Sequence, residues 1–275
     1  MVADGSGRSF LPDVSTSRPN AARVYDLLLG GKNSFEVDRQ LHAELLKVAP
    51  EIPNLVRENR RWLGRMIETM VREGGVDQFL DLGCGLPTTD NTHDVVQRLN
   101  PQATVVYVDN DPTVVAHGLA LLADERTVHF VDADLTDPAA LLADPVITKV
   151  LDLSRPVGVL QGLVLHHIPG QARARRAVDG YLSAMAPGSY LAMTHPINPR
   201  DGGRLAEFAT AVEDALRPAI SPIAFRTPAE VAELVEGLEL LPPGLTTIAD
   251  SCPTSDQSAK PTGVTRLVMA VLARK

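Results

Sequence analysis

The chain has 275 residues, and its 26 Lys and Arg residues against 34 Asp and Glu residues give a formal net charge of −8. Apolar residues make up 44% of the chain and aromatic residues 4%. This composition predicts a globular protein with a sizeable core, and it excludes extensive disorder and a base-stacking surface for nucleic acid. Since only short basic runs interrupt the negative charge, we expect no nucleic-acid partner.

The two cysteines, Cys84 and Cys252, lie in neither a CxxC pair nor a Cys/His cluster with zinc spacing. They therefore predict no disulfide framework and no metal site. The sequence has no stretch of about 20 apolar residues that would span a membrane. Its start also has no basic segment followed by an apolar one, which a secretory signal would have. Together these features predict a cytoplasmic protein with no membrane partner.

The first 74 residues divide into a tail and a helical region. Residues 1–18 are rich in Gly, Ser, Asp and Pro without periodicity, which predicts a flexible tail outside the fold. Residues 19–74 repeat apolar side chains at helical spacing, for example Trp62, Met66 and Met70. A Gly-Gly pair and two prolines punctuate this region, so we expect about three helices.

From residue 75 onward, short apolar runs alternate with amphipathic stretches. The runs are residues 79–82, 104–108, 128–131, 157–165 and 190–194. The stretches between them are residues 90–99, 111–123, 138–143 and 171–185. This alternation predicts βαβ units, and hence an α/β fold with a doubly wound, mostly parallel sheet over 75–275.

The end of the chain follows a different order. Two helices, near 204–216 and 228–236, precede an apolar run at 238–248 and a last strand at 266–272, which brings the predicted sheet to seven strands. The polar, proline-containing stretch 249–263 predicts a flexible loop.

A glycine turn follows the first predicted strand, in the sequence Asp81-Leu82-Gly83-Cys84-Gly85. Glycines here let the backbone approach a ligand, and the N-terminus of the next helix offers free N–H groups. A dinucleotide site needs a third glycine at the position of Thr88. An NAD(P)-dependent oxidoreductase is therefore disfavoured.

Two further strand ends carry polar groups that suit S-adenosylmethionine, which has a ribose but no phosphate. Asp109, next to Asn110 and 24 residues past Gly85, is placed to accept the ribose hydroxyls. Asp134 and Leu135 follow the third strand, where a polar group suits the adenine. Each feature alone is also typical of a turn or a helix cap. Because ligands of open α/β sheets bind where these strand ends converge, their order and spacing together favour this cofactor.

The motifs also resemble a known family. The run ARVYDLLLGGKN at residues 22–33, QFLD before GLPT, and VYVDNDP at 106–112 resemble the S-adenosyl methyltransferase family that opens with ARVYD-LLGGK-NF. The resemblance covers roughly residues 18–248. It implies a class I methyltransferase fold, in which residues 19–74 form a helical N-terminal lid over a Rossmann-like cofactor-binding domain.

The same resemblance implies roles for three residues of the opening motif, Tyr25, Lys32 and Asn33. Spacing alone favours a helix end with a solvated lysine. The family resemblance instead implies that Lys32 or Asn33 faces the methionine carboxylate or closes the pocket, since a cation or an amide donor suits a carboxylate.

His166 and His167 follow the fourth strand, on the side where class I enzymes hold the methyl acceptor. Adjacent residues of an extended chain point to opposite faces, so we expect only His166 to face the pocket. It would take a proton from the molecule that receives the methyl group. Correct positioning of the reacting atoms nevertheless supplies most of the rate acceleration in an in-line methyl transfer. A structural histidine is the alternative, and His195 is a weaker candidate of the same type.

The sequence thus predicts an S-adenosylmethionine-dependent methyltransferase that acts on a small molecule. The chain reads Leu165-His166-His167-Ile168-Pro169 where amino-group nucleic-acid methyltransferases carry Asn-Pro-Pro-aromatic, and it lacks the Pro-Cys loop of cytosine-C5 enzymes. A non-catalytic cofactor-binding or regulatory protein is the second hypothesis. The sequence predicts neither the acceptor nor the oligomeric state.

Overall fold

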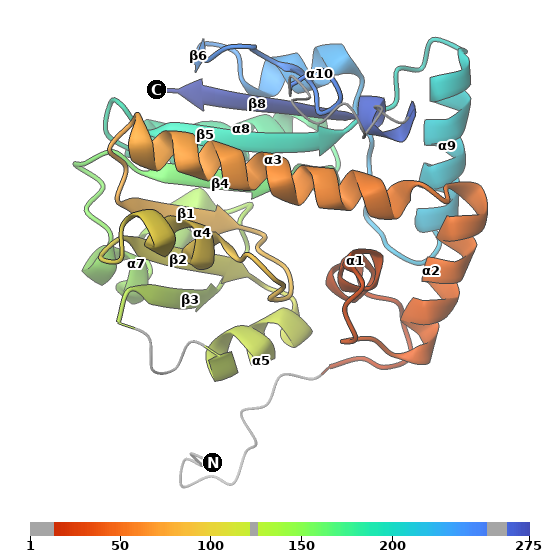
Figure 1. The fold of residues 1–275 in the computed structure, drawn as a ribbon, viewed down its shortest axis with the longest axis horizontal. Helices are drawn as coiled ribbons and strands as arrows, with labels where there is room; N and C mark the ends of the chain where they lie inside the picture. The colour runs from red at the N-terminus through yellow and green to blue at the C-terminus, as the bar shows by residue number, and fades with distance from the viewer. Residues whose placement is uncertain (1–13, 122–125, 252–262) are drawn as a thin grey trace, which may run out of the picture.

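The structure is a computed structural model that describes residues 14–121, 126–251 and 263–275 (Figure 1). Most of the predicted tail and most of the predicted loop at 249–263 lie outside these residues. Residues 14–18, the described part of the tail, form neither a helix nor a strand.

The centre of the fold is a single sheet with the strand order β3-β2-β1-β4-β5-β8-β6. Its strands are β1 (Gln78–Leu82), β2 (Thr104–Asp109), β3 (Val128–Asp132), β4 (Gly158–Gly162), β5 (Tyr190–Pro196), β6 (Glu239–Leu240), β7 (Thr246–Thr247) and β8 (Val268–Arg274). Strands β1 to β5 pair in parallel, and only the pairs that involve β8 are antiparallel. The doubly wound, mostly parallel sheet is confirmed.

The C-terminal edge of the sheet differs in detail from the prediction. The apolar run at 238–248 forms two short strands, β6 and β7, which both pair with β8, so the described residues form eight strands. Pro242 and Pro243 interrupt the run, because proline has no N–H to donate to a neighbouring strand. Strand β8 begins at Val268 because a short 3-10 helix, η2 (Gly263–Leu267), precedes it.

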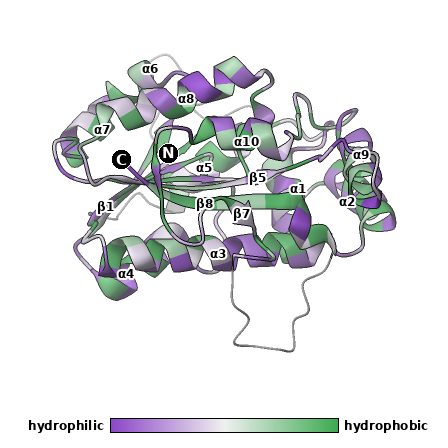
Figure 2. Cartoon of the chain, turned by 90° about the horizontal axis from the view of Figure 1, so that it is seen from above, coloured by the Kyte–Doolittle hydropathy of each residue, from purple (hydrophilic) through white to green (hydrophobic). Residues whose placement is uncertain are grey.

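Helices cover both faces of the sheet (Figure 2). On one face lie α3 (Ile52–Arg72) and α4 (Thr92–Leu99), and on the other α6 (Pro138–Leu142), α7 (Pro145–Val150), α8 (Gln171–Ala184) and α10 (Pro228–Leu234). Trp62 and Met70 of α3 pack against Phe79 and Ala192 of the sheet. Helix α5 (Pro112–Leu121) contacts β2 and β3. The sequence did not predict α7, whose six residues are too few for a periodic signal.

A third group of helices lies beyond the carboxyl ends of the parallel strands (Figure 1). It consists of α1 (Ala21–Leu29), α2 (Glu36–Val48) and α9 (Arg204–Leu216). Val24, Leu45, Val212 and Phe225 belong to one buried cluster there, separate from the two clusters that flank the sheet. The region at 19–74 thus contains the three expected helices. Of these, α1 and α2 belong to this third group, whereas α3 lies along one face of the sheet (Figure 2).

The opening motif builds the α1–α2 pair. Arg23 donates from Nε to Oδ2 of Asp38 over 2.7 Å, and both side chains are buried. The Asp38 carboxylate also accepts the backbone N–H groups of Asn20 and Phe35, at 2.9 and 2.8 Å. This one carboxylate therefore joins the start of α1 to the start of α2.

The Gly-Gly pair of the motif meets a second carboxylate. Gly30 ends α1 with a φ of 91°, in the left-handed region that favours glycine. A Cβ atom on Gly31 would lie 2.1 Å from Oδ1 of Asp26. Asp26 in turn accepts the backbone N–H of Asn33 at 2.9 Å. The glycines are required because the loop folds directly over the buried Asp26.

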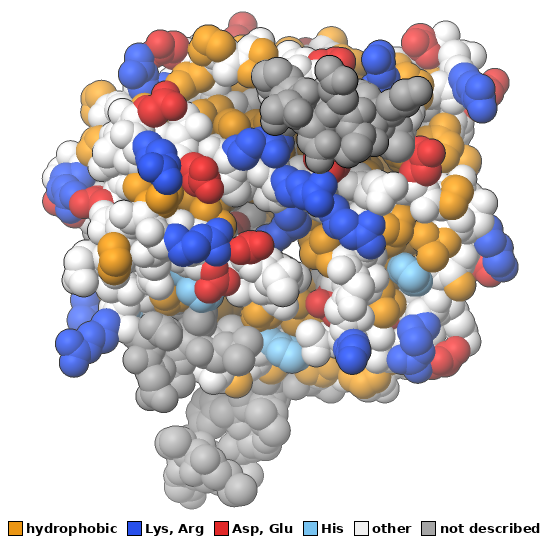
Figure 3. Space-filling view, viewed as in Figure 1, with side chains coloured by type: hydrophobic (Ala, Val, Ile, Leu, Met, Phe, Trp, Pro, Cys, Tyr) orange, Lys and Arg blue, Asp and Glu red, His pale blue; other side chains and the backbone are white. Residues whose placement is uncertain are grey.

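The surface of the described residues carries mixed charge. On the face drawn in Figure 3, Lys and Arg side chains are interspersed with Asp and Glu. Within the described residues, no helix is both long and apolar enough to cross a membrane.

Replacing Asp38 by Asn should lower the free energy of unfolding by about 3–5 kcal/mol, because it leaves the buried Arg23 guanidinium without its counter-charge. Urea unfolding followed by circular dichroism measures this loss. Glu36→Gln is the matched control on the same helix, since Glu36 pairs with Arg39 at the surface and should cost less than about 1 kcal/mol. Equal losses for the two variants would contradict the structural role of the buried pair.

Candidate active site

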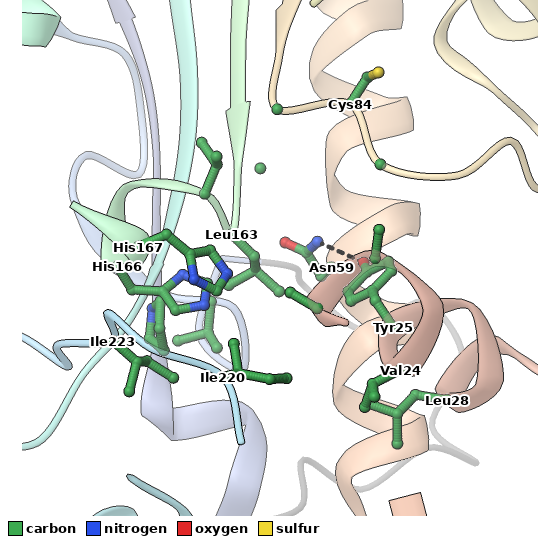
Figure 4. A pocket seen from close by; sticks show the side chains of 18 of the residues that line it. Val24, Tyr25, Leu28, Asn59, Cys84, Leu163, His166, His167, Ile220 and Ile223 are labelled. Atoms are coloured by element: carbon green, nitrogen blue, oxygen red, sulfur yellow. Dashed lines mark hydrogen bonds between the residues drawn. The ribbon is translucent and has the colours of Figure 1, made fainter. Parts of the chain in front are cut away.

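A cavity of about 580 Å³ lies where the carboxyl ends of the strands meet α1, α3 and α9 (Figure 4). Nine of the predicted site residues line it: Tyr25, Asp81, Gly83, Gly85, Asp109, Asn110, Asp134, Leu135 and His166. Tyr25 and His166, which are 141 positions apart in the sequence, therefore line the same cavity.

Lys32 and Asn33 do not line this cavity. Both are exposed, because the left-handed Gly30 turns the chain away from the end of α1 and the backbone N–H of Asn33 is bound to Asp26. The structure thus gives these two residues no contact with the cavity, and only Tyr25 of the three motif residues reaches it.

The glycine turn after β1 is pinned to the neighbouring strand. The backbone N–H groups of Gly83 and Cys84 donate to the carbonyl oxygen of Val108, at 2.8 and 3.2 Å. Gly83 and Gly85 have φ values of 69° and 68°, which favour glycine. A Cβ atom on Gly83 would lie 2.2 Å from Val164, whereas nothing lies within 4 Å of one on Gly85. Gly85 therefore presents open space.

Asp109 holds this turn from the end of β2. Its Oδ2 accepts the backbone N–H of Gly85 at 2.9 Å, and its Oδ1 accepts that of Asp111 at 3.0 Å. Each carboxylate oxygen has two lone pairs, so each can accept one further hydrogen bond. Burial raises the pKa of Asp109 above its ordinary value.

Asp111 has a different role. Its Oδ1 accepts the backbone N–H of Thr113 at 2.8 Å and so caps α5. Its Oδ2 accepts a hydrogen bond from the side chain of Asn20. This contact joins the start of α1 to the end of β2, next to Asp109.

Asp81 fixes the helix that follows the turn. Thr92 at the start of α4 donates from Oγ1 to Oδ2 of Asp81 over 2.6 Å. Burial raises the pKa of the Asp81 carboxyl, and burial together with the charges of Asp109 and Asp81 raises that of the Cys84 thiol well above its usual range. Cys84 is therefore a neutral thiol at pH 7.

Arg60 and Asn59, on α3, line the cavity although no sequence motif marks them. Arg60 donates to Oγ1 of Thr88 at 3.0 Å and to the carbonyl oxygen of Asp90 at 2.9 Å, which places its guanidinium beside the glycine turn. In the sequence Arg60 is one of several arginines on an amphipathic helix. Only the packing of α3 against the strand ends distinguishes it.

The third strand end contributes Asp134 and Leu135. Asp134 accepts the backbone N–H of Thr136 at 2.8 Å, and the carbonyl oxygen of Leu135 accepts the hydroxyl of Tyr181 at 2.7 Å. Burial raises the pKa of Tyr181, so this hydroxyl keeps the proton that it donates.

His166 and His167 both line the cavity, so the expectation that only one would face it is wrong. Strand β4 ends at Gly162 instead of continuing to residue 165, and the two histidines lie on a short 3-10 helix, η1 (Leu165–His167). A helical turn does not send adjacent side chains to opposite faces as an extended chain does. Their rings lie 4.0 Å apart between centroids.

A buried guanidinium positions η1 from behind. Arg226 donates to the carbonyl oxygens of Leu165 and Ile168, at 3.0 and 2.8 Å, and to Nε2 of His195 at 2.8 Å. Since arginine only donates, Nε2 of His195 must accept, and Nδ1 donates to the carbonyl oxygen of Pro196 at 2.7 Å. His195 is therefore a structural residue here.

Both buried imidazoles are neutral at pH 7. Burial, assisted by the other histidines and Arg226, lowers the pKa of His166 well below its ordinary value. Burial and Arg226 lower the pKa of His195 to about 3. Within the described residues, Nδ1 of His166 has no hydrogen-bond partner.

The cavity wall divides into two parts by charge. The polar half carries Arg60, Asp81, Asp90, Asp109, Asp111, Asp134 and Arg173. The apolar half carries Val24, Leu28, Phe208, Ile220, Ile223 and Phe225, with Tyr25, Asn59, His166 and His167 as its polar side chains.

A family model described as S-adenosyl methyltransferase matches residues 9–275, nearly the whole chain. The chain belongs to this family. It is therefore an S-adenosylmethionine-dependent methyltransferase, and the predicted cofactor is confirmed. A comparison with curated proteins finds no match.

Solved structures agree with the family. A protein from Thermobifida fusca YX that is assigned as a methyltransferase is 38% identical, with a TM-score of 0.86 over 97% of this chain and 99% of that one. A DUF574 family protein from Streptomyces avermitilis is 32% identical, with a TM-score of 0.87 over 94% and 98%. An O-methyltransferase family 2 protein from Planctomyces limnophilus, in complex with apigenin, is 13% identical, with a TM-score of 0.51 over 92% and 65%, and shares the fold.

The residues of this methyltransferase fit the cofactor. The ribose of S-adenosylmethionine has two hydroxyl donors, and Asp109 has two free acceptor positions beside a backbone turn that leaves space at Gly85. A cation suits the carboxylate of its methionine part, and the Arg60 guanidinium lies beside the glycine turn.

Acidification should destabilise the methyltransferase through His195. Its ordinary pKa of 6.5 is lowered to about 3 in the folded protein, so below about pH 6.5 the unfolded chain takes up a proton that the folded protein cannot. The free energy of unfolding should then fall with pH, by up to about 1.4 kcal/mol per pH unit from this residue.

Urea unfolding at pH 7.5, 6.0 and 5.0 measures this slope. His195→Gln keeps an acceptor for Arg226 but does not titrate, so its slope should be shallower by about 1 kcal/mol per pH unit. Parallel slopes for the two proteins would show that His195 takes up its proton in the folded state.

Proposed function

We propose that this methyltransferase acts on a small molecule, by in-line methyl transfer inside the cavity. The observation that carries the proposal is the division of one cavity into a charged half that suits the cofactor and an apolar half that suits an acceptor. A site of this kind excludes water from the reacting atoms and fixes their orientation, which supplies most of the rate gain in such a transfer.

Different residues of the polar half would bind different parts of the cofactor. Asp109 would accept the ribose hydroxyls, and Asn110, Asp134 and Leu135 would surround the adenine. The turn at Gly83–Gly85, which follows Asp81, would run beside the methionine part. Arg60 would bind the carboxylate of that part. When bound, S-adenosylmethionine supplies a methyl carbon that is activated by the positive charge on its sulfur.

His166 is the residue that we propose to accept a proton from the acceptor. It is neutral, it lines the apolar half, and Arg226 holds the backbone on which it sits.

Two predictions from composition stay proposals. We expect no nucleic-acid partner, which the net charge of −8 and the mixed surface charge support. We also expect the protein to work in the cytoplasm.

Asp109→Ala should weaken the binding of S-adenosylhomocysteine about ten- to a hundredfold, because it removes charge-assisted hydrogen bonds from a buried site. Isothermal titration calorimetry measures the change. Asp111→Ala is the comparison, since Asp111 caps α5 and its loss should cost about 1 kcal/mol of stability and weaken the ligand less than Asp109→Ala does. If Asp111→Ala lost the ligand and Asp109→Ala kept it, the ribose site would be misassigned.

Arg60→Met tests the methionine end. It should weaken S-adenosylhomocysteine about tenfold or more, because a charged pair is lost. It should leave the affinity for 5′-methylthioadenosine nearly unchanged, since that molecule has the same ribose and adenine but no carboxylate. An equal loss for both ligands would mean that Arg60 acts on the glycine turn instead of on the carboxylate.

A further inference from the structure

Charge is absent from the apolar half of the cavity. All the Asp, Glu, Lys and Arg side chains among its described lining residues belong to the polar half, around the glycine turn and the ends of β2 and β3. A charged group that enters an apolar wall without a partner loses its hydration and gains nothing in return. The apolar half is therefore built for an uncharged molecule.

One polar pair on this wall has unused hydrogen-bonding capacity. Asn59 is 1% exposed, and its Nδ2 donates to the hydroxyl oxygen of Tyr25 at 3.1 Å. Its Oδ1 is buried and has no partner among the described residues. Burial raises the pKa of Tyr25, so this residue keeps its hydroxyl hydrogen. The pair thus holds one free acceptor, on Asn59, and one free donor, on Tyr25.

This pair faces His166 and His167 across the cavity (Figure 4). Buried polar atoms are almost always hydrogen-bonded, so an unpaired amide oxygen in a cavity wall is a position that a ligand with a hydrogen-bond donor would satisfy. The opposite wall offers no charge either, because the pKa values of both histidines are lowered by burial.

We propose that the methyl acceptor is an uncharged, mainly apolar molecule that presents a hydroxyl group to the Tyr25–Asn59 pair. A hydroxyl donates one hydrogen bond and accepts another, and so it satisfies both residues at once. This hydroxyl anchors the molecule and is a different group from the one whose proton His166 would accept. A carboxylate has no donor for Asn59, an ammonium group has no acceptor for Tyr25, and an ether has no donor. The inference rests on the proposed function, since it assigns the apolar half to the acceptor.

Three probes with the same ring system test it: 2-naphthol, 2-methoxynaphthalene, which lacks the donor, and 2-naphthoate, which is charged. Their affinities are measured by calorimetry on the full-length protein, with and without saturating S-adenosylhomocysteine. We expect 2-naphthol to bind about tenfold more tightly than either of the other two.

Two variants assign this preference to the pair. Asn59→Leu replaces the amide by an apolar group of similar size, and Tyr25→Phe removes only the hydroxyl. Each should reduce the preference for 2-naphthol over 2-methoxynaphthalene to about threefold or less, while the preference over 2-naphthoate persists because the wall stays uncharged. Thermal unfolding of both variants checks that they are folded.

The proposal is overturned if 2-naphthoate binds as tightly as 2-naphthol, if 2-naphthol does not bind, or if Asn59→Leu keeps the full preference. The affinity for S-adenosylhomocysteine is measured separately on the same proteins. If the unsubstituted protein did not bind S-adenosylhomocysteine, the cofactor assignment would be contradicted. A wrong order among the three probes contradicts only the acceptor class.

Discussion

The hydrogen bond from the backbone N–H of Gly85 to the carboxylate of Asp109, 2.9 Å long, holds the site together. It ties the turn after β1 to the end of β2, and two further backbone bonds to Val108 reinforce it. The bond fixes the glycine turn at the one edge of the sheet where five parallel strands end. It leaves a lone pair on each oxygen of Asp109 for the ribose hydroxyls that we propose it accepts.

The helices above the site are tied to this same point. Asn20, at the start of α1, donates to Asp111, two residues past Asp109, and Arg23 donates to Thr113 at 3.2 Å. Arg23 is in turn paired with the buried Asp38 of α2. The wall that carries Tyr25 is thus positioned by contacts with the strand end that carries Asp109, so the polar and apolar halves of the cavity are built as one unit.

The sequence predicted the parts of the site that depend on local structure. A short apolar or β-branched run followed by a glycine turn or a carboxylate marks a strand end in one short window. Gly83, Gly85, Asp109 and Asp134 were found in this way. The mostly parallel character of the sheet followed from the alternation of strands and helices, since parallel strands require crossover connections.

The parts that depend on packing between distant segments were not predicted. Arg60 and Asn59 are ordinary polar residues of a long helix until α3 is laid beside the strand ends. Lys32 and Asn33 were placed at the pocket by resemblance, but the loop that carries them folds over Asp26 and points them outward. His167 was excluded on the assumption of an extended chain, whereas β4 ends three residues earlier than predicted and a helical turn follows.

A crystal structure of the protein with S-adenosylhomocysteine tests the account most directly. It should show both ribose hydroxyls about 2.6–3.0 Å from the oxygens of Asp109, with the sulfur directed at the half of the cavity lined by Tyr25, Asn59 and His166. A ribose bound away from Asp109, or a sulfur directed away from that apolar half, would contradict it.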